Sequence, residues 1–189
     1  VGLPMAMRAV EVGLDVVGLD SDKRRVDLLA SGESFVEDIS NERLRAALDT
    51  GRYLPTTNPD DSEEFDFAVI SVPTPLREGV PDLSFIEDAV RDLAPHLRVG
   101  ATVILESTTW PGTTEEFVAP ILEGASGLTA GREFHLGYSP ERIDPGNTVW
   151  TFETTPKVVS GVTKESLYVI RRFYDQLVDE TVPVPTPKE

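Results

Sequence analysis

Residues 65–73 read FDFAVISVP, a short apolar run rich in β-branched side chains. A run that is apolar on both faces is typical of a strand buried in a parallel sheet. Residues 101–108, ATVILEST, form a second run of this kind. Between the two, residues 82–97 place apolar side chains at helical intervals, with Ser84 and Glu87 spaced as a capping box. The whole stretch therefore predicts a β–α–β unit.

The same alternation continues in both directions along the chain. Further strands are expected at 15–20, 133–139 and 156–162, and further helices at 21–32, 41–51, 113–122 and 163–178. Gly32 and Gly51 would close the first two of these helices, and Thr113 with Glu116 would form a capping box for the third. The proline-rich tail, 182–189, predicts an edge strand or a linker. The pattern predicts an α/β fold of the Rossmann-like, doubly wound type, with a mainly parallel sheet and helices on both faces.

Composition excludes several classes of function. The 189 residues suit one domain, contain no cysteine and hold two histidines, His96 and His135, which argues against a metal site of several histidines. The net charge of −16 argues against binding to a nucleic-acid backbone. No apolar run has the length of a membrane span. The acidic, lysine-poor composition fits either a salt-adapted cytoplasm or a merely acidic protein.

The first twenty residues, VGLPMAMRAVEVGLDVVGLD, fit the downstream half of a dinucleotide-binding βαβ unit. Gly2 fits the last glycine of the fingerprint G-x-G-x-x-G, and Asp20 has nearly the spacing of the acid that binds the adenosine ribose. A carboxylate there favours NAD, because it would repel the extra phosphate of NADP. The first strand and the first two glycines would then lie before Val1. On these residues alone, a turn glycine and a helix cap are an equal alternative.

Two hydroxyl-bearing stretches follow the carboxyl ends of predicted strands, where open α/β sheets bind ligands. In residues 70–76, ISVPTPL, two prolines hold Thr74 on a stiff loop. In residues 105–116, LESTTWPGTTEE, residues 107–109 offer three hydroxyls, including that of Thr108, that could reach a cofactor or substrate. The alternative for both stretches is ordinary turn chemistry.

Residues 138–147, YSPERIDPGN, follow another predicted strand. Glu141 behind a proline is a candidate general base on a rigid loop, and Arg142 is a candidate clamp for a carboxylate, phosphate or amide oxygen. A surface Glu–Arg pair on a turn would give the same pattern.

Taken together, these motifs resemble the nucleotide-sugar dehydrogenases of the UDP-glucose/GDP-mannose dehydrogenase family, in order and in spacing. The matching motifs are VGLPMA, VVGLD, SVPTPL, ESTTWPGTTEE and YSPERIDPGN. The segment SPERIDPG resembles the branch that acts on UDP-N-acetylmannosamine or UDP-N-acetylglucosamine, whereas UDP-glucose enzymes typically have Pro-Glu-Phe-Leu there. The resemblance implies oxidation of the sugar C6 alcohol to a carboxylate in two NAD-dependent steps, through a thiohemiacetal and a thioester on a cysteine.

The resemblance also implies roles for residues near the cofactor. Val1 and Gly2 would lie at the pyrophosphate, Asp20 on the adenosine ribose, and Arg25 beside the same end of NAD. Thr74 would line the cofactor.

Other residues would serve the reaction itself. Thr108 would line the cofactor and the reacting centre, where it would hold a water molecule or the sugar oxygen. Glu141 matches the glutamate that activates or orients the water that hydrolyses the thioester. Arg142 and Ile143 would contact the UDP-sugar. No metal is implied.

Residues 1–189 correspond to the NAD-binding domain of that family. The resemblance implies that a dimerising helix and a second domain with the catalytic cysteine follow in a homodimeric, cytoplasmic parent enzyme of polysaccharide precursor synthesis. The 189 residues alone are expected to be inactive and to bind NAD weakly. Lys157 and Lys164 do not match the catalytic lysine and are interpreted as solvated, and His135 as a strand residue without a role. The rival functions are a UDP-glucose 6-dehydrogenase, a β-hydroxyacid dehydrogenase and a non-catalytic NAD-binding module.

Overall fold

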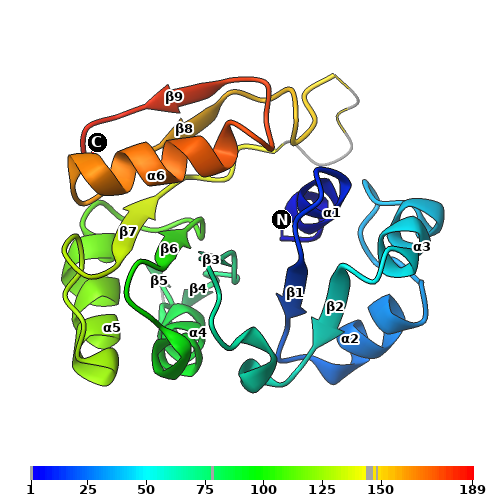
Figure 1. The fold of residues 1–189 in the computed structure, drawn as a ribbon, viewed down its shortest axis with the longest axis horizontal. Helices are drawn as coiled ribbons and strands as arrows, with labels where there is room; N and C mark the ends of the chain where they lie inside the picture. Colours follow the sequence, from blue (N-terminus) through cyan, green and yellow to red (C-terminus); the bar gives the residue numbers. More distant parts are fainter. Residues whose placement is uncertain (1, 78, 144–146, 148) are drawn as a thin grey trace. The chain divides into compact units, whose positions relative to one another are not determined.

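The computed structural model describes residues 2–77, 79–143, 147 and 149–189. The helices are α1 (Gly2–Glu11), α2 (Lys23–Ala30), α3 (Asn41–Asp49), α4 (Ser84–Leu93), α5 (Ala119–Ser126) and α6 (Lys164–Tyr174). The strands are β1 (Val16–Leu19), β2 (Tyr53–Thr56), β3 (Phe67–Ile70), β4 (Leu76–Arg77), β5 (Val80–Pro81), β6 (Thr102–Leu105), β7 (His135–Tyr138), β8 (Lys157–Val159) and β9 (Thr181–Pro183). Figure 1 shows their order along the chain.

These elements form two compact units. Unit 1 comprises 1–62, 143–155 and 176–179, and unit 2 comprises 63–142, 156–175 and 180–189. In unit 1, β1 and β2 pair in parallel, with Val16 opposite Tyr53 and Leu19 opposite Thr56. Helices α1, α2 and α3 bury apolar side chains against this pair, among them Met7, Leu29 and Leu44. Burial of these faces stabilises the small two-stranded sheet, which could not stand alone.

Strand β2 was not among the predicted strands. Its sequence, YLPT, contains a proline, which disfavours a strand in an isolated reading. The tertiary structure shows how β2 is accommodated beside β1, at Gly18. A Cβ atom there would lie 2.7 Å from the hydroxyl oxygen of Tyr53, so glycine makes room for the ring of the neighbouring strand.

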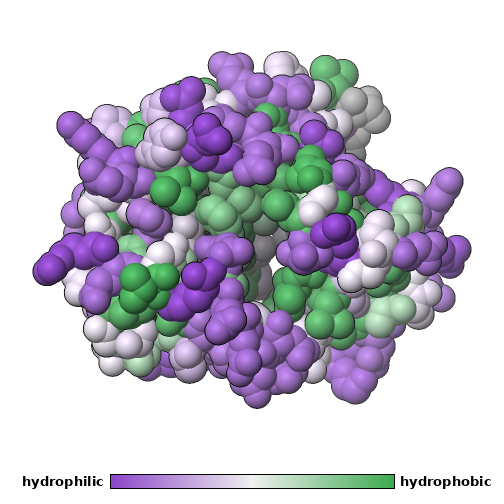
Figure 2. Space-filling model, viewed as in Figure 1, coloured by the Kyte–Doolittle hydropathy of each residue, from purple (hydrophilic) through white to green (hydrophobic). Residues whose placement is uncertain are grey.

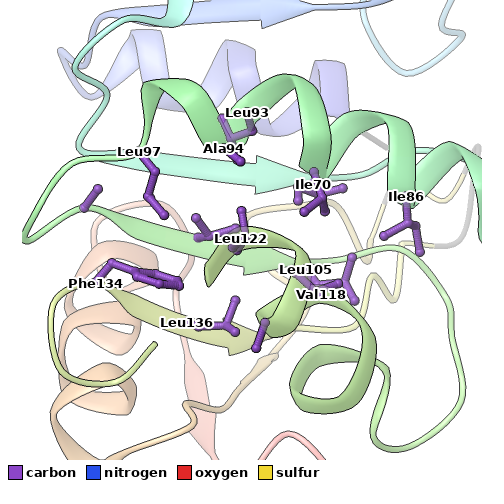
Figure 3. Close-up of a cluster of buried hydrophobic side chains, with 14 residues drawn as sticks. Ile70, Ile86, Leu93, Ala94, Leu97, Leu105, Val118, Leu122, Phe134 and Leu136 are labelled. Atoms are coloured by element: carbon purple, nitrogen blue, oxygen red, sulfur yellow. The ribbon is translucent and has the colours of Figure 1, made fainter. Parts of the chain in front are cut away.

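Unit 2 contains a parallel sheet in the order β3-β6-β7. All four residues of the central strand β6 are buried, as expected for a strand that is apolar on both faces. Helices α4 and α5 cover one face, where Figure 3 shows Ile86 and Leu122 directed toward Leu105 and Leu136 of the sheet. The predicted buried strands and the helix between them are thus confirmed.

Helix α6 packs on the other face of this sheet (Figure 1). Phe173 stacks on Phe67 of β3, with 4.4 Å between ring centroids. At Gly137 of β7 a Cβ atom would lie 2.1 Å from the backbone oxygen of Ser160 and 2.4 Å from Ile170, so glycine permits this close packing. Helices on both faces of a parallel sheet confirm the Rossmann-like, doubly wound fold class.

The structure confirms two helix ends and corrects two helix starts. Gly32 and Gly51 follow α2 and α3 with φ of 79° and 71°, as a glycine after a helix end requires. Ser84, however, is already helical, and the amide of Ser84 donates to the Asp82 carboxylate at 3.0 Å. The predicted capping box of Ser84 and Glu87 is therefore wrong, because Asp82, two residues earlier, satisfies that amide.

The second predicted capping box is also wrong. Thr113 begins a π-helical turn, η3 (Thr113–Val118), which precedes α5. The residue before it is Gly112 at φ 96°, and the Thr113 hydroxyl donates back to the Trp110 carbonyl at 2.8 Å. The N-cap position is thus occupied by Gly112 in a left-handed conformation, and not by Thr113 with the extended backbone that an N-cap threonine needs.

Hydrophilic residues dominate the surface seen in Figure 2, with smaller hydrophobic areas between them. None of the helices in the described residues is long and apolar enough to span a membrane. Within the same residues, no three histidine or acidic side chains gather in a way that could hold a metal ion.

Candidate cofactor and catalytic site

The cofactor residues expected at the start of the chain lie in unit 1. Helix α1 begins at Gly2, while Val1 lies outside the described residues. Asp20 directly follows β1, and Oδ1 of its carboxylate accepts the Asp22 amide at 2.8 Å. Arg25, in α2, places Nη1 3.5 Å from Oδ2 of Asp20. The structure thus brings Asp20 and Arg25 together at the carboxyl end of a parallel strand.

The Asp20 carboxylate is suited to accept hydroxyl groups. Its side chain is 32% exposed, and the Asp22 amide fixes its orientation. The neighbouring Tyr53, like any tyrosine, is uncharged at neutral pH. Burial, and to a lesser degree Asp20, raises the pKa of Tyr53 further, to about 12. A fixed, accessible carboxylate fits the ribose hydroxyls of NAD and would repel an added phosphate. The residues present in unit 1 therefore fit NAD.

Arg25 has a second contact that the sequence did not indicate. Its guanidinium carbon lies 5.6 Å from the centroid of the Phe35 ring, which is 44% exposed. The ring and Asp20 together limit the directions that the arginine side chain can take.

In unit 2, a hydrogen bond joins the two predicted hydroxyl-bearing loops. The Thr74 hydroxyl donates to the Thr108 carbonyl at 2.8 Å, so the loop after β3 and the loop after β6 are held side by side. The Ser107 hydroxyl donates to the Val72 carbonyl at 2.8 Å and is buried. Ser107 is thus used by the backbone, whereas Thr108 is exposed and keeps its side chain available.

Glu141 lies three residues after β7. Its Oε1 accepts the Arg142 amide at 2.6 Å, and its side chain is only 10% exposed. The Arg142 side chain is exposed and that of Ile143 is half-buried. Arg142 belongs to unit 2 and Ile143 to unit 1, at the point where the chain passes between the two units.

Lys157 corrects one interpretation from the sequence. Far from being solvated, this first residue of β8 is 3% exposed. Its Nζ lies 2.7 Å from Oε1 of Glu106 and 3.3 Å from Oε2 of Glu141. Lys164, by contrast, is exposed as expected. The physical reason is that Glu106, directly after β6, needs a cation inside the protein. Only the folded chain brings β8, which pairs with β9 in a separate sheet, close to Glu106.

Tyr174 of α6 completes this group of side chains. Its hydroxyl donates to the same Oε1 of Glu106 at 2.7 Å, and its ring centroid lies 5.4 Å from Lys157 Nζ. Burial and the adjacent Glu106 raise the pKa of Tyr174 well above its ordinary range, so the hydroxyl remains a donor. Burial also raises the pKa of Glu106, although Lys157 opposes that shift. We call Glu106, Glu141, Lys157 and Tyr174 the buried charge cluster.

Sequence reasoning missed Glu106, Lys157 and Tyr174 as neighbours of Glu141. A signal existed, because Glu106 and Lys157 each adjoin a run of apolar strand residues. A charged residue at such a position needs a partner when the strand is buried. The sequence does not say which partner, since 51 positions separate the two residues.

Comparison with known proteins identifies relatives that match nearly the whole chain. The family model described as UDP-glucose/GDP-mannose dehydrogenase family, NAD binding domain, matches residues 1–178. Protein CapL of Staphylococcus aureus is 37% identical over 94% of this chain and 41% of its own length. UDP-N-acetyl-D-glucosamine 6-dehydrogenase of Salmonella typhi is 38% identical over the same shares of the two chains. The chain thus spans about two fifths of these curated relatives.

A solved structure agrees with these relatives. The UDP-D-ManNAc dehydrogenase from Pyrococcus horikoshii superimposes with a TM-score of 0.92 and 32% sequence identity. The match covers 98% of this chain and 45% of that protein. The described fold, including both units, is therefore found within a larger protein.

Proposed function

Because the chain belongs to the UDP-glucose/GDP-mannose dehydrogenase family and NAD is the cofactor of its matching domain, we propose its function as follows. It is the NAD-binding domain of an enzyme that oxidises the C6 alcohol of a UDP-N-acetyl-hexosamine to the uronic acid in two NAD-dependent steps. The observation that carries this substrate class is the agreement between relatives named for UDP-N-acetyl-D-glucosamine and UDP-D-ManNAc.

The proposal includes a parent protein longer than 189 residues. A first strand and two glycines would precede Val1, and a dimerising helix and a UDP-sugar domain would follow. Two observations support this. The chain spans 41% of its curated relatives, and it contains no cysteine to carry a covalent intermediate. The parent would be a homodimer without nucleic-acid or membrane partners.

The proposed cofactor contacts follow the geometry of unit 1. Asp20 would accept the adenosine ribose hydroxyls, with Arg25 beside it, and the first turn of α1 at Gly2 would face the pyrophosphate. Val1 would lie at the same phosphates. In unit 2, the hydrogen bond between Thr74 and Thr108 supports a shared wall that lines the cofactor. When bound, NAD supplies the hydride acceptor for each oxidation.

The proposed catalytic contacts come from unit 2. Glu141 would take a proton from the water that hydrolyses the thioester, and Thr108 would hold that water or the sugar oxygen. Arg142 and Ile143 would contact the nucleotide sugar, and the exposed guanidinium of Arg142 suits a phosphate or amide oxygen. We further propose that the parent acts in the cytoplasm on precursors of cell-surface polysaccharides.

The substrate experiment is a measurement of NADH release by the full-length parent with UDP-glucose, UDP-N-acetylglucosamine and UDP-N-acetylmannosamine. We expect sustained release with an acetamido sugar. Release with UDP-glucose alone would point to the UDP-glucose branch. Release with small hydroxyacids would favour a β-hydroxyacid dehydrogenase. No release with any of the substrates would favour a non-catalytic NAD-binding module.

The cofactor experiment compares two aspartates that flank β1. Asp20→Ala is expected to weaken NAD binding about tenfold, equivalent to ~1.4 kcal/mol, as measured by calorimetry. Asp15→Ala is the control, because Asp15 is 82% exposed and pairs with Arg52 at the other end of the strand. Equal affinities of the two variants would contradict the assignment of Asp20.

A further inference from the structure

Lys157 is an unusual lysine for this chain. The other lysines, Lys23, Lys164 and Lys188, are all exposed, whereas Lys157 is buried. A lysine is rarely buried unless it is paired, because its ammonium loses its hydration. The contacts of Lys157 therefore decide why it is inside.

Those contacts join residues from separate strand ends. Glu106 follows β6, Glu141 follows β7 and Lys157 begins β8. The Lys157 ammonium donates toward Oε1 of Glu106 and Oε2 of Glu141, over 2.7 Å and 3.3 Å. It is thus the cation that stands between two carboxylates, one fully buried and one at the edge of the proposed reaction site.

The inner carboxylate is itself fixed. Glu106 Oε1 receives both Lys157 and the Tyr174 hydroxyl, while Oε2 has no hydrogen-bond partner among the described residues. A buried ion pair gains little stability over a well-packed apolar pair. Overall stability alone therefore does not explain why a lysine stands at this position.

Glu141 is held from two sides. The Arg142 amide binds Oε1 and the Lys157 ammonium binds Oε2. Two donors on two different oxygens fix the rotation of the carboxylate as well as its location. A base is effective only when its oxygen is within hydrogen-bond reach of the proton that it removes.

We propose that Lys157 is a positioning residue that, anchored by Glu106 and Tyr174, holds the Glu141 carboxylate in the orientation needed to activate water. This inference rests on the proposed function for the step it serves. In that step the water oxygen bonds to the thioester carbonyl carbon, one water proton passes to Glu141, and the carbon–sulfur bond breaks to release the thiolate. Lys157 touches neither water nor thioester.

The test separates positioning from packing by comparing two variants that both lack the Glu106 carboxylate. Lys157→Met alone would leave Glu106 buried without this cation, so the reference is Glu106→Gln and the test is Glu106→Gln with Lys157→Met. Both lack the ion pair between Lys157 and Glu106, and they differ in whether the Lys157 ammonium still contacts Glu141. The amide oxygen that Glu106→Gln introduces can still accept the Tyr174 hydroxyl. If the double variant does not fold, Glu106→Gln with Lys157→Gln replaces it.

In the full-length parent, we expect the double variant to lower kcat about tenfold to a hundredfold relative to Glu106→Gln. The ratio kcat/KM for the UDP-sugar should stay unchanged, because the slowed hydrolysis follows formation of the thioester. Intact-mass spectra of quenched reactions should show the acyl adduct accumulating on the enzyme, since its hydrolysis is the slowed step. Lys164→Met, an exposed lysine of α6, should match the wild type in both measurements. Equal turnover and no adduct in the double variant would overturn the positioning role.

A second readout does not depend on the reaction. The Arg142 amide reports on Glu141 because it donates to Oε1. In ¹⁵N–¹H spectra of the 189-residue chain, its resonance should shift between Glu106→Gln and the double variant, and an unchanged resonance would contradict the inference. If the wild-type parent released no NADH from any UDP-sugar, the proposed function would be refuted. The spectrum does not depend on turnover, so the two failures can be told apart.

Discussion

Unit 1 and unit 2 use charge in opposite ways. In unit 1, Asp20 and Arg25 form a 3.5 Å pair with side chains that are 32% and 53% exposed. In unit 2, Lys157 and Glu106 form a 2.7 Å pair with side chains that are 4% and 0% exposed. The exposed pair is accessible to a ligand and contributes little to stability, whereas the buried pair is enclosed by its partners. The comparison teaches that a surface pair suits recognition and a buried pair suits orientation.

The largest effect should come from breaking the buried pair. Lys157→Met removes the ammonium that both carboxylates contact, and we expect it to lower the free energy of unfolding by about 3–5 kcal/mol. Lys164→Met is the matched control, with an expected change within about 0.5 kcal/mol. Urea unfolding of both variants measures the difference. Similar stabilities would mean that Lys157 is solvated after all.

A smaller effect is expected from the hydroxyl that anchors Glu106. Tyr174→Phe removes the donor at 2.7 Å and should destabilise the chain by about 1–3 kcal/mol. Tyr168→Phe, on the same helix but 64% exposed, controls for the loss of a tyrosine. Thermal unfolding of the pair gives the comparison, and equal midpoints would show that the hydrogen bond contributes nothing.

The burial of Glu106 should make the free energy of unfolding depend on pH. Burial raises the pKa of Glu106 above its ordinary value of about 4.3. The stability linked to this proton is fully present below that ordinary value and is lost as the pH rises through the folded pKa. Relative to Glu106→Gln, the wild type should therefore lose stability with rising pH. Urea unfolding from about pH 4 to about pH 8 tests this, and the reverse slope would mean that Lys157 outweighs burial.

The smallest effect is expected in unit 1. Arg25→Ala should change the free energy of unfolding by less than about 0.5 kcal/mol, and added salt should reduce the difference further because the pair is exposed. The same urea unfolding at low and high salt measures it. A loss comparable to that of Lys157→Met would remove the contrast between the two units.

Local signals in the sequence predicted much of the fold. The apolar runs at 65–73 and 101–108 became β3 and β6, and Gly32 and Gly51 end helices as expected. These features depend on near neighbours in the chain, which is why pattern alone reveals them. The errors at Ser84 and Thr113 have the same origin, because cap spacing indicates a helix start but not which polar group serves it.

The candidate site shows the same difference between local signals, which the sequence reveals, and long-range contacts, which it does not. Motif position and family resemblance singled out Asp20, Thr74, Thr108 and Glu141, and the structure joins Thr74 to Thr108. They did not reveal that Lys157 contacts the Glu141 carboxylate. That contact depends on how the fold brings the end of β7 close to the start of β8.

The sequence by itself determined the fold class, the family and the residues that follow the predicted strands, since all three are set by local composition and motif order. Only the tertiary structure decided the state of Lys157. Desolvation penalises a buried charge until a partner arrives from elsewhere in the chain. Glu106 and Tyr174, which lie 51 residues before Lys157 and 17 residues after it, meet it only when the sheet and α6 have come together.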